Sequence, residues 1–264
     1  MIRPLLALLL LSATAPAMAQ EREFCPDRPG LGTPPCIVDS GKIVVETGLA
    51  DWTLERDPET RTDTILAGDL LVRLGVAKHA EVQIGWTAYG HERLRDRASG
   101  AISRTARTGD VTLALRRSLI HPDGSGPSIA LMPYVSLPVG RMPVGAGDWG
   151  AGLIVPMRFD LSDSLSIGLS PEMDAAVDED GDGRHLAYGS VIGLSADLSD
   201  KISASIELSA MRDDDPEGHV TESLAGLSMG WQPKDDLQFD IGTNVGLNRD
   251  SADVEVYAGI SRRF

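Results

Sequence analysis

The chain has 264 residues, of which 42% are hydrophobic and 24% are charged, and its formal net charge is −15. This acidic balance excludes a general nucleic-acid-binding surface, which needs clustered lysine and arginine. Beyond the first 19 residues the sequence has no run of about 18 apolar residues, so an α-helical membrane protein is also excluded.

Residues 1–19 are typical of a secretory signal peptide. Arg3 supplies the positive start, Leu5–Leu11 the apolar run, and Ala17–Ala19 the small-residue cleavage site. The apolar run is too short to span a bilayer. We therefore expect export and a mature chain that begins near Gln20.

Residues 20–41 form a leader rich in proline and glycine, which we expect to be periplasmic. It contains the two cysteines of the chain, Cys25 and Cys36. In an oxidising periplasm a disulfide between them is expected, and it would stabilise the short loop by about 2 to 3 kcal/mol. The alternative is a pair of free thiols in a disordered leader.

From residue 42 to the C-terminus, apolar residues alternate with polar or small ones. In the clearest case, Leu237, Phe239 and Ile241 oppose Gln238 and Asp240, which is the period-two pattern of a strand with one apolar face. Twelve such segments can be placed, at residues 42–56, 62–76, 80–90, 110–120, 128–138, 149–161, 165–177, 185–198, 202–211, 221–232, 237–247 and 254–264. Prolines 133, 156 and 171 are expected to mark bulges or distorted pairing.

Alternation alone also fits a soluble β-sandwich. The connections separate the two classes, because tight turns such as 77–79 and 199–201 alternate with long polar loops such as 91–109 and 212–220. Short turns on one side and long loops on the other are typical of outer-membrane barrels. The sequence therefore predicts an all-β protein: an antiparallel up-and-down transmembrane β-barrel of about twelve strands, formed by residues 42–264.

The last segment ends the chain on an aromatic residue, Phe264, as the last strand of bacterial outer-membrane barrels does. We expect it to act as the signal to the barrel-assembly machinery. The expected surroundings are the lipid and lipopolysaccharide of the bacterial outer membrane. Of the outward-facing arginines, Arg117 and Arg262 fall at periplasmic strand ends, where their stems can reach the interface.

Four stretches resemble the outer-membrane channel family named for the meta-pathway of phenol degradation. They are residues 70–76 running into 81–86, residues 109–116, residues 133–140 and the terminal Gly-Ile-Ser-Arg-Arg-Phe. Arg262 departs from the usual end, where an aromatic or aliphatic residue is more common. The resemblance implies an outer-membrane transporter that passes small organic, often aromatic, compounds.

The inward faces of the strands carry the candidate lumen and selectivity residues. A wall with charges of both signs can set the ion preference of a pore. The alternative is that these groups pair and fill a closed barrel. The pair most expected to form is Arg73 with Glu81, and the leader is expected under the barrel mouth as a partial plug. The candidates are Arg73, Glu81, Gln83, Arg116, Tyr134, Arg158, Asp160, Glu172, Asp174, Glu207, Asp240 and Tyr257.

Other chemistry is less strongly indicated. Asp178, Asp180 and Asp182 have the spacing of a calcium loop but lack its final glutamate and flanking helices, so a solvated hairpin tip is the alternative. No histidine accompanies a serine in a recognisable motif, so no enzyme and no cofactor are expected. The expected function is passive diffusion of small organic solutes; the alternative is a structural or surface-interaction barrel with a blocked lumen and acidic, cation-binding loops.

Overall fold

The computed structural model describes residues 21–264, and the signal peptide expected at residues 1–19 lies outside this range. The strands are β1 (Ile43–Arg56), β2 (Thr60–Ala77), β3 (Ala80–Asp96), β4 (Ile102–Arg107), β5 (Val111–Ile120), β6 (Ser128–Leu137), β7 (Gly150–Ile154), β8 (Met157–Ser162), β9 (Leu165–Val177), β10 (Arg184–Ser199), β11 (Ile202–Asp215), β12 (Gly218–Lys234), β13 (Leu237–Gly246) and β14 (Val254–Arg263). Within the described residues, no helix is long and apolar enough to cross a membrane.

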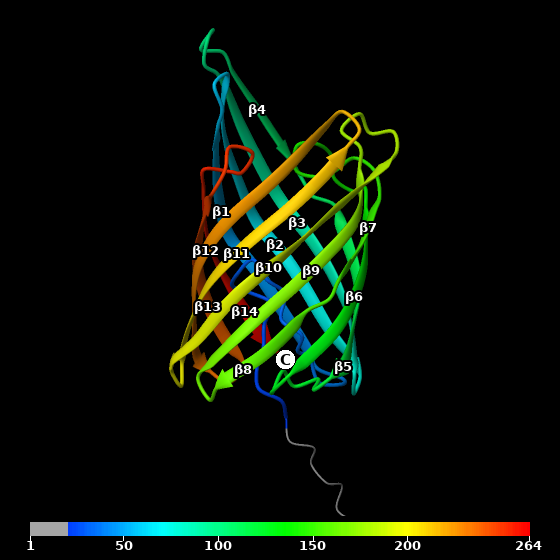
Figure 1. The fold of residues 1–264 in the computed structure, drawn as a ribbon, viewed down its shortest axis with the longest axis vertical. Helices are drawn as coiled ribbons and strands as arrows, with labels where there is room; N and C mark the ends of the chain where they lie inside the picture. Colours follow the sequence, from blue (N-terminus) through cyan, green and yellow to red (C-terminus); the bar gives the residue numbers. More distant parts are fainter. Residues whose placement is uncertain (1–20) are drawn as a thin grey trace, which may run out of the picture.

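All strand pairs are antiparallel, and the sheet closes on itself (Figure 1). β14 pairs with β1, and the other neighbours along the wall follow chain order, except where β3 pairs with β5 and where β7 and β8 share one place. β4 pairs only with β3, and β7 and β8 both pair with β6 and β9, as two halves of one wall strand. The wall therefore has twelve strand positions, which confirms the expected barrel.

Proline explains the break between β7 and β8. Pro156 has no N–H to donate to the ladder, and β7 ends at Ile154 while β8 begins at Met157. The neighbouring groups still bond across the gap, since Val155 N donates to Pro171 O at 2.9 Å and Ala130 N donates to Pro156 O at 2.9 Å. Pro171 itself stays within β9, opposite Ser190.

The strands are longer on one side than the sequence predicts. β3 continues to Asp96 and forms with β4 a hairpin that projects beyond the wall, where the sequence predicted a loop (Figure 1). β11 and β12 likewise extend to Asp215 and Gly218. These extensions stand on the side of the long loops, while the turns at 78–79, 163–164, 200–201 and 235–236 lie at the opposite end with Phe264 (Figure 1).

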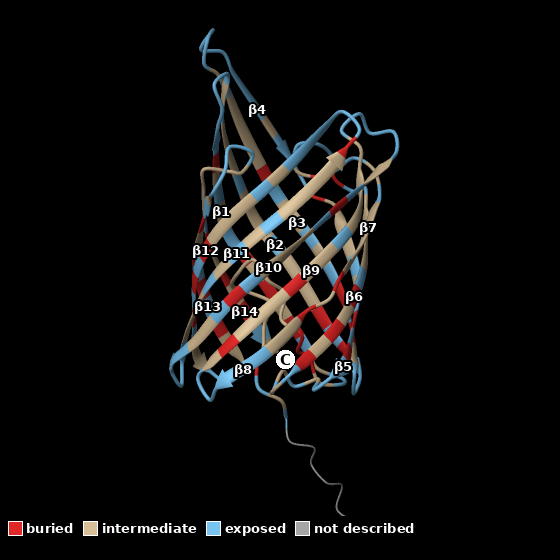
Figure 2. Ribbon diagram, in the orientation of Figure 1, coloured by how far each residue is buried: buried red, intermediate tan, exposed pale blue. Residues whose placement is uncertain are grey.

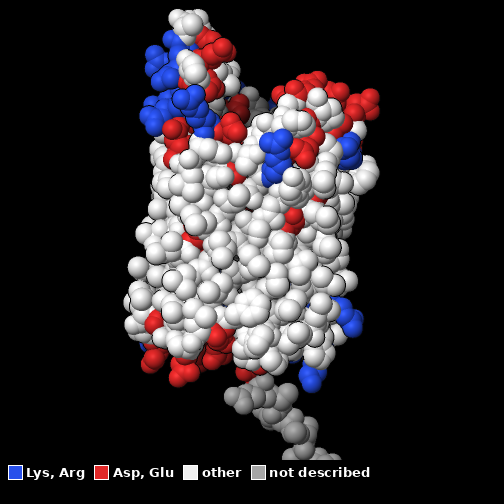
Figure 3. All heavy atoms as spheres, viewed as in Figure 1, with Lys and Arg blue, Asp and Glu red and all other residues white. Residues whose placement is uncertain are grey.

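The barrel is apolar outside and polar inside. Large exposed side chains such as Ile84, Ile206 and Ile241 are each more than half exposed on the outer wall. On the side shown in Figure 3, charged residues gather at the two ends and are sparse on the wall between them. The buried positions of the wall, red in Figure 2, include Arg73, Arg116 and other polar residues. This inverted burial is what lipid outside and a polar lumen require.

Candidate functional site

Residues 21–41 run from the end that carries the tight turns into the barrel and back to the start of β1. We call them the N-terminal plug. In Figure 1 the blue chain enters at the end that carries the tight turns and continues within the wall. The sequence placed this segment under the barrel mouth, whereas its contacts reach the middle of the lumen: Thr33 N donates to Ser170 Oγ at 3.0 Å. The expected disulfide between Cys25 and Cys36 is present.

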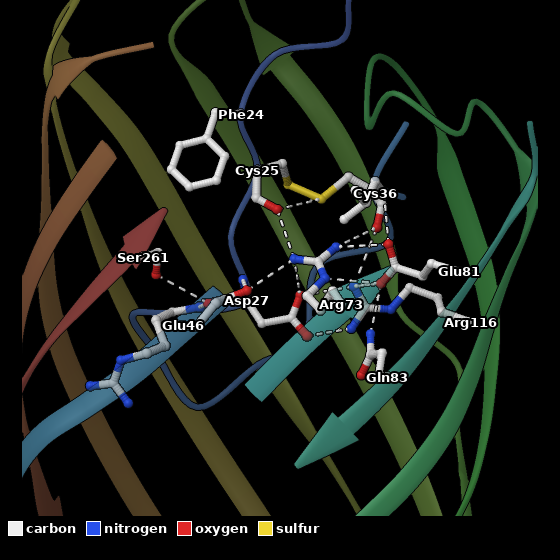
Figure 4. A network of polar contacts seen from close by, with 12 residues as sticks. Phe24, Cys25, Asp27, Cys36, Glu46, Arg73, Glu81, Gln83, Arg116 and Ser261 are labelled. Atoms are coloured by element: carbon white, nitrogen blue, oxygen red, sulfur yellow. Dashed lines mark hydrogen bonds and ion pairs between the residues drawn. A yellow bond between two sulfur atoms is a disulfide. The ribbon is translucent and has the colours of Figure 1, made fainter. Parts of the chain in front are cut away.

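Two buried arginines of the wall hold the plug (Figure 4). Strand register places Arg73 of β2 opposite Gln83 of β3, and Glu81 of β3 opposite Arg116 of β5, all on the inward side. Arg73 Nε lies 2.9 Å from Glu81 Oε1, so the expected ion pair is present. Gln83 Nε2 donates to the same oxygen at 2.7 Å.

Asp27 of the plug joins both arginines. Its Oδ1 lies 2.8 Å from Arg73 Nη1, and Arg116 Nη1 donates to it at 2.8 Å. The same guanidinium groups donate to plug carbonyls, Arg73 to Cys25 O at 2.9 Å and Arg116 to Cys36 O at 3.2 Å. Burial alone would raise the pKa of Asp27, but the charges of Arg116 and Arg73 outweigh it and hold the pKa below its usual value.

Glu46 of β1 completes this cluster. Its carboxylate accepts the backbone N–H groups of Asp27 and Arg28, both at 2.9 Å, and lies 3.2 Å from Arg73 Nη1. The cluster therefore sets two guanidinium groups against three carboxylates, with Arg73, Arg116, Glu46 and Glu81 fully buried. Buried charges of this kind are stable only when all are paired, so plug and wall depend on each other.

Further wall carboxylates bind the backbone of the plug. Glu207 accepts from Leu31 N at 2.7 Å and Gly32 N at 3.0 Å, and Glu81 accepts from Val38 N at 2.6 Å. The hydroxyl of Tyr257 accepts from Gly30 N at 3.1 Å. These bonds satisfy amide groups that the proline- and glycine-rich plug cannot place in a sheet.

Arg28 anchors the plug on β13 and β14, the strands that precede β1 around the wall. Its Nη2 lies 3.0 Å from Asp240 Oδ1, and its guanidinium carbon lies 5.4 Å from the ring centre of Tyr257. Two wall glycines leave room for the plug: a Cβ on Gly259 would overlap Arg28, and a Cβ on Gly75 would overlap the backbone oxygen of Asp39.

Above the plug, the lumen becomes acidic. The hydroxyl of Tyr134 lies 2.6 Å from Asp174 Oδ1 and 3.0 Å from Glu172 Oε1, two acceptors for one proton. Apart from Arg107 at the rim, no described lysine or arginine occupies an inward strand position in this outer half. Inward carboxylates there include Asp51, Glu55, Asp69, Glu92, Glu172, Asp174, Asp213, Glu222 and Glu255.

The structure thus places all twelve candidate lumen residues on the inward side of the wall. Six of them touch the plug: Arg73, Glu81, Arg116, Glu207, Asp240 and Tyr257. Tyr134, Glu172 and Asp174 lie in the outer half. Arg158 and Asp160 pair with each other at 2.9 Å, partly exposed at the end that carries the tight turns and apart from the network.

Sequence reasoning missed Asp27 and Arg28. Their only signal was that they are the charged residues between the two cysteines. The proposed calcium residues do not gather as a loop: Asp182 N donates to Asp180 Oδ1 at 2.8 Å at an exposed tip, while Asp178 Oδ1 lies 2.9 Å from His185 Nδ1.

Solved structures with a similar fold are outer-membrane barrels. The NanC porin matches with a TM-score of 0.52 and 10% identity, covering 83% of this chain and 98% of its own. The KdgM porin in complex with disordered oligogalacturonate gives 0.52 and 9%, covering 84% and 99%. The transport unit of the autotransporter AIDA-I from Escherichia coli gives 0.54 and 7%, covering 84% and 89%. At such identities the likeness shows the fold alone.

No curated protein matches the chain. A family model does match, over residues 26–264, which include most of the plug and the whole wall. Its description is "Putative MetA-pathway of phenol degradation". The chain therefore belongs to this family, and its barrel is that of a bacterial outer-membrane protein.

Proposed function

We propose that the protein is an outer-membrane channel that passes small organic solutes, aromatic ones among them, by passive diffusion. The observation that carries the proposal is the closed twelve-position wall with an apolar outside and a polar inside. Such a wall offers a solvated path across a bilayer. The likeness to porins and the family description, which names phenol degradation, support the channel and the aromatic solutes respectively.

The plug must move for solutes to pass. Its buried apolar contacts are few, since Phe24, Val38 and Val44 form the one cluster of buried hydrophobic residues in residues 21–264. Its other attachments are ion pairs and hydrogen bonds to the wall, which water can replace when the plug shifts. We therefore propose a closed state, in which the plug is docked on the Arg73–Arg116 cluster, and a conducting state in which the plug leaves it.

The carboxylates in the outer half of the lumen should select which solutes enter. Carboxylates that line a narrow, low-dielectric passage concentrate cations and repel anions. Neutral or positively charged organic solutes are therefore proposed rather than organic acids. We also propose that Phe264 and its strand engage the assembly machinery, and that the acidic loops meet lipopolysaccharide through divalent cations.

The second candidate is a structural or surface-interaction barrel with a permanently blocked lumen. The full burial and mutual pairing of Arg73, Arg116, Glu46 and Glu81 favour it, because such a cluster resists opening. In this case the acidic loops, rather than the lumen, carry the function.

Planar-bilayer recording separates the candidates. Protein that lacks residues 21–41 should conduct in discrete steps, and the full mature chain should conduct with a lower open probability. Correct folding is checked for both by heat-modifiable gel mobility. A wild-type barrel that never opens, beside a deletion variant that does, would favour the blocked barrel; silence of both would reject a channel.

A further inference from the structure

A cluster of metal-ligating groups lies outside the lumen network, at the rim that carries the long loops. Asp178 follows β9, His185 is the second residue of β10, and Asp215 ends β11. Strand pairing brings them together, since His185 is opposite Ala176 of β9 and Asp213 is opposite Ala187 of β10. The cluster therefore joins the β9–β10 loop to the tip of the β11–β12 hairpin.

The distances in this cluster suit a metal ion. His185 Nδ1 lies 2.9 Å from Asp178 Oδ1 and 3.3 Å from Asp215 Oδ2. One ligand atom of each residue lies within 4.8 Å of the other two. In a tetrahedral site with bonds of about 2.0 to 2.2 Å, neighbouring ligand atoms stand roughly 3.3 Å apart. Small side-chain shifts would therefore admit an ion.

The imidazole of His185 supplies the nitrogen of the cluster. Its side chain is 5% exposed, and the nitrogen that lacks an aligned hydrogen-bond partner among residues 21–264 is Nε2, which is turned away from Asp178 and Asp215. Nδ1 meanwhile faces two carboxylate oxygens. A carboxylate of Asp213 lies 2.7 Å from Nε2, where a metal-ligating histidine commonly places an orienting acid.

Backbone N–H groups hold the carboxylate of Asp215, but no arginine neutralises the cluster. Glu179 N and Glu217 N donate to the two oxygens of Asp215 at 2.8 and 2.7 Å. The nearest arginines are engaged elsewhere: Arg184 pairs with Asp148 at 2.8 Å, and Arg212 pairs with Asp214 at 2.7 Å. Even a protonated imidazole would leave Asp178, Asp213 and Asp215 with an excess negative charge.

We propose that Asp178, His185 and Asp215 bind a divalent transition metal ion of the Zn²⁺ class. One nitrogen and two carboxylate ligands suit Zn²⁺, whereas Ca²⁺ takes six to eight oxygens. The ion would fasten the β9–β10 loop to the β11–β12 hairpin at the extracellular rim. Asp180 and Asp182 take no part. The proposal does not depend on whether the lumen conducts.

The test measures Zn²⁺ binding to folded, tag-free protein in detergent by equilibrium dialysis. One Zn²⁺ per barrel is expected. His185→Ala and Asp215→Asn should each weaken binding at least tenfold, and Asp213→Asn about 10- to 100-fold, as loss of an orienting carboxylate does. The Asp180→Asn/Asp182→Asn variant is the matched control and should bind as the wild type does. Heat-modifiable mobility confirms that each variant is folded.

Limited proteolysis gives a second readout. Zn²⁺ should slow tryptic cleavage after Arg184 in the wild type but not in His185→Ala. The proposal is overturned if the wild type binds no Zn²⁺ or if His185→Ala binds it unchanged. It is also overturned if Ca²⁺, and not Zn²⁺, protects the loop and this protection needs Asp180 and Asp182.

Discussion

Replacement of Arg116 by alanine should release the plug. Arg116 is fully buried and touches Asp27, Glu81 and the carbonyl oxygen of Cys36. Its loss leaves Arg73 alone against the carboxylates of Asp27, Glu46 and Glu81, so the excess of negative charge in the docked state rises from one to two. Removing one partner of a buried ion pair commonly destabilises the docked state by about 3 to 5 kcal/mol.

This energy applies to the docked plug, because the same carboxylates are hydrated once the plug leaves. Each 1.4 kcal/mol is a factor of ten, so the equilibrium between open and closed barrels should shift by roughly 100-fold or more. The assay is single-channel recording of the purified barrel in planar bilayers. Arg116→Ala should raise the open probability strongly. Arg116→Lys should raise it less, because lysine keeps the charge but not the two-pronged geometry.

The neighbouring residue supplies a matched control. Arg117 lies on the same strand but faces outward and is exposed, so Arg117→Ala removes the same charge without touching the plug. Its open probability should equal that of the wild type. The reasoning would be refuted if folded Arg116→Ala barrels stayed as silent as Arg117→Ala barrels.

Three further predictions concern the same plug. Reduction of the Cys25–Cys36 disulfide should speed chymotryptic cleavage after Leu31, because the loop loses about 2 to 3 kcal/mol of stabilisation. A Cys25→Ser/Cys36→Ser variant should be cleaved equally fast with and without reductant. Gly75→Ala should also speed this cleavage, because the new methyl group would overlap the backbone of Asp39. Gly85→Ala should not, because the nearest atom to its Cβ is Thr112 Cβ at 3.6 Å, an ordinary contact. Equal cleavage of the two variants would contradict the docking geometry. Docking lowers the pKa of Asp27 below its ordinary value of about 4. The ionised carboxylate therefore stabilises the docked plug at pH values above about 4, and this stabilisation is lost as the pH falls through the pKa of the docked state. The open probability should therefore rise below about pH 4, and a pH response unchanged in Asp27→Asn would exclude Asp27 as its source.

The sequence was sufficient for the wall because lipid and water impose opposite demands on successive residues. Alternation located all twelve strand positions, and the inward side assigned to Arg73 and Arg116 agrees with the register. The Arg73–Glu81 pair could be predicted because a tight turn joins their strands, which places the two residues at nearly the same position along the barrel axis. Pro156 could be predicted to disturb its strand for want of an N–H.

Other features carried no such signal. The β3–β4 hairpin and the end of β11 stand above the membrane, where both faces meet water and the period-two pattern fades; Arg93 and Arg95 there look like loop residues. The plug has no regular structure and hence no period. Its contacts, such as Arg28 with Asp240, join residues 212 positions apart and follow only from closure of the wall. For the same reason Asp215 could not be joined to His185 from sequence.

The central claim is that the mature N-terminus closes the barrel from within. The most direct measurement is a crystal structure of the detergent-solubilised protein, with the sulfur atoms located by anomalous scattering. The account predicts the Cys25–Cys36 sulfur peak inside the wall, beside the guanidinium groups of Arg73 and Arg116, with Asp27 between them. A sulfur peak outside the barrel, with the two arginines facing solvent in the lumen, would contradict it.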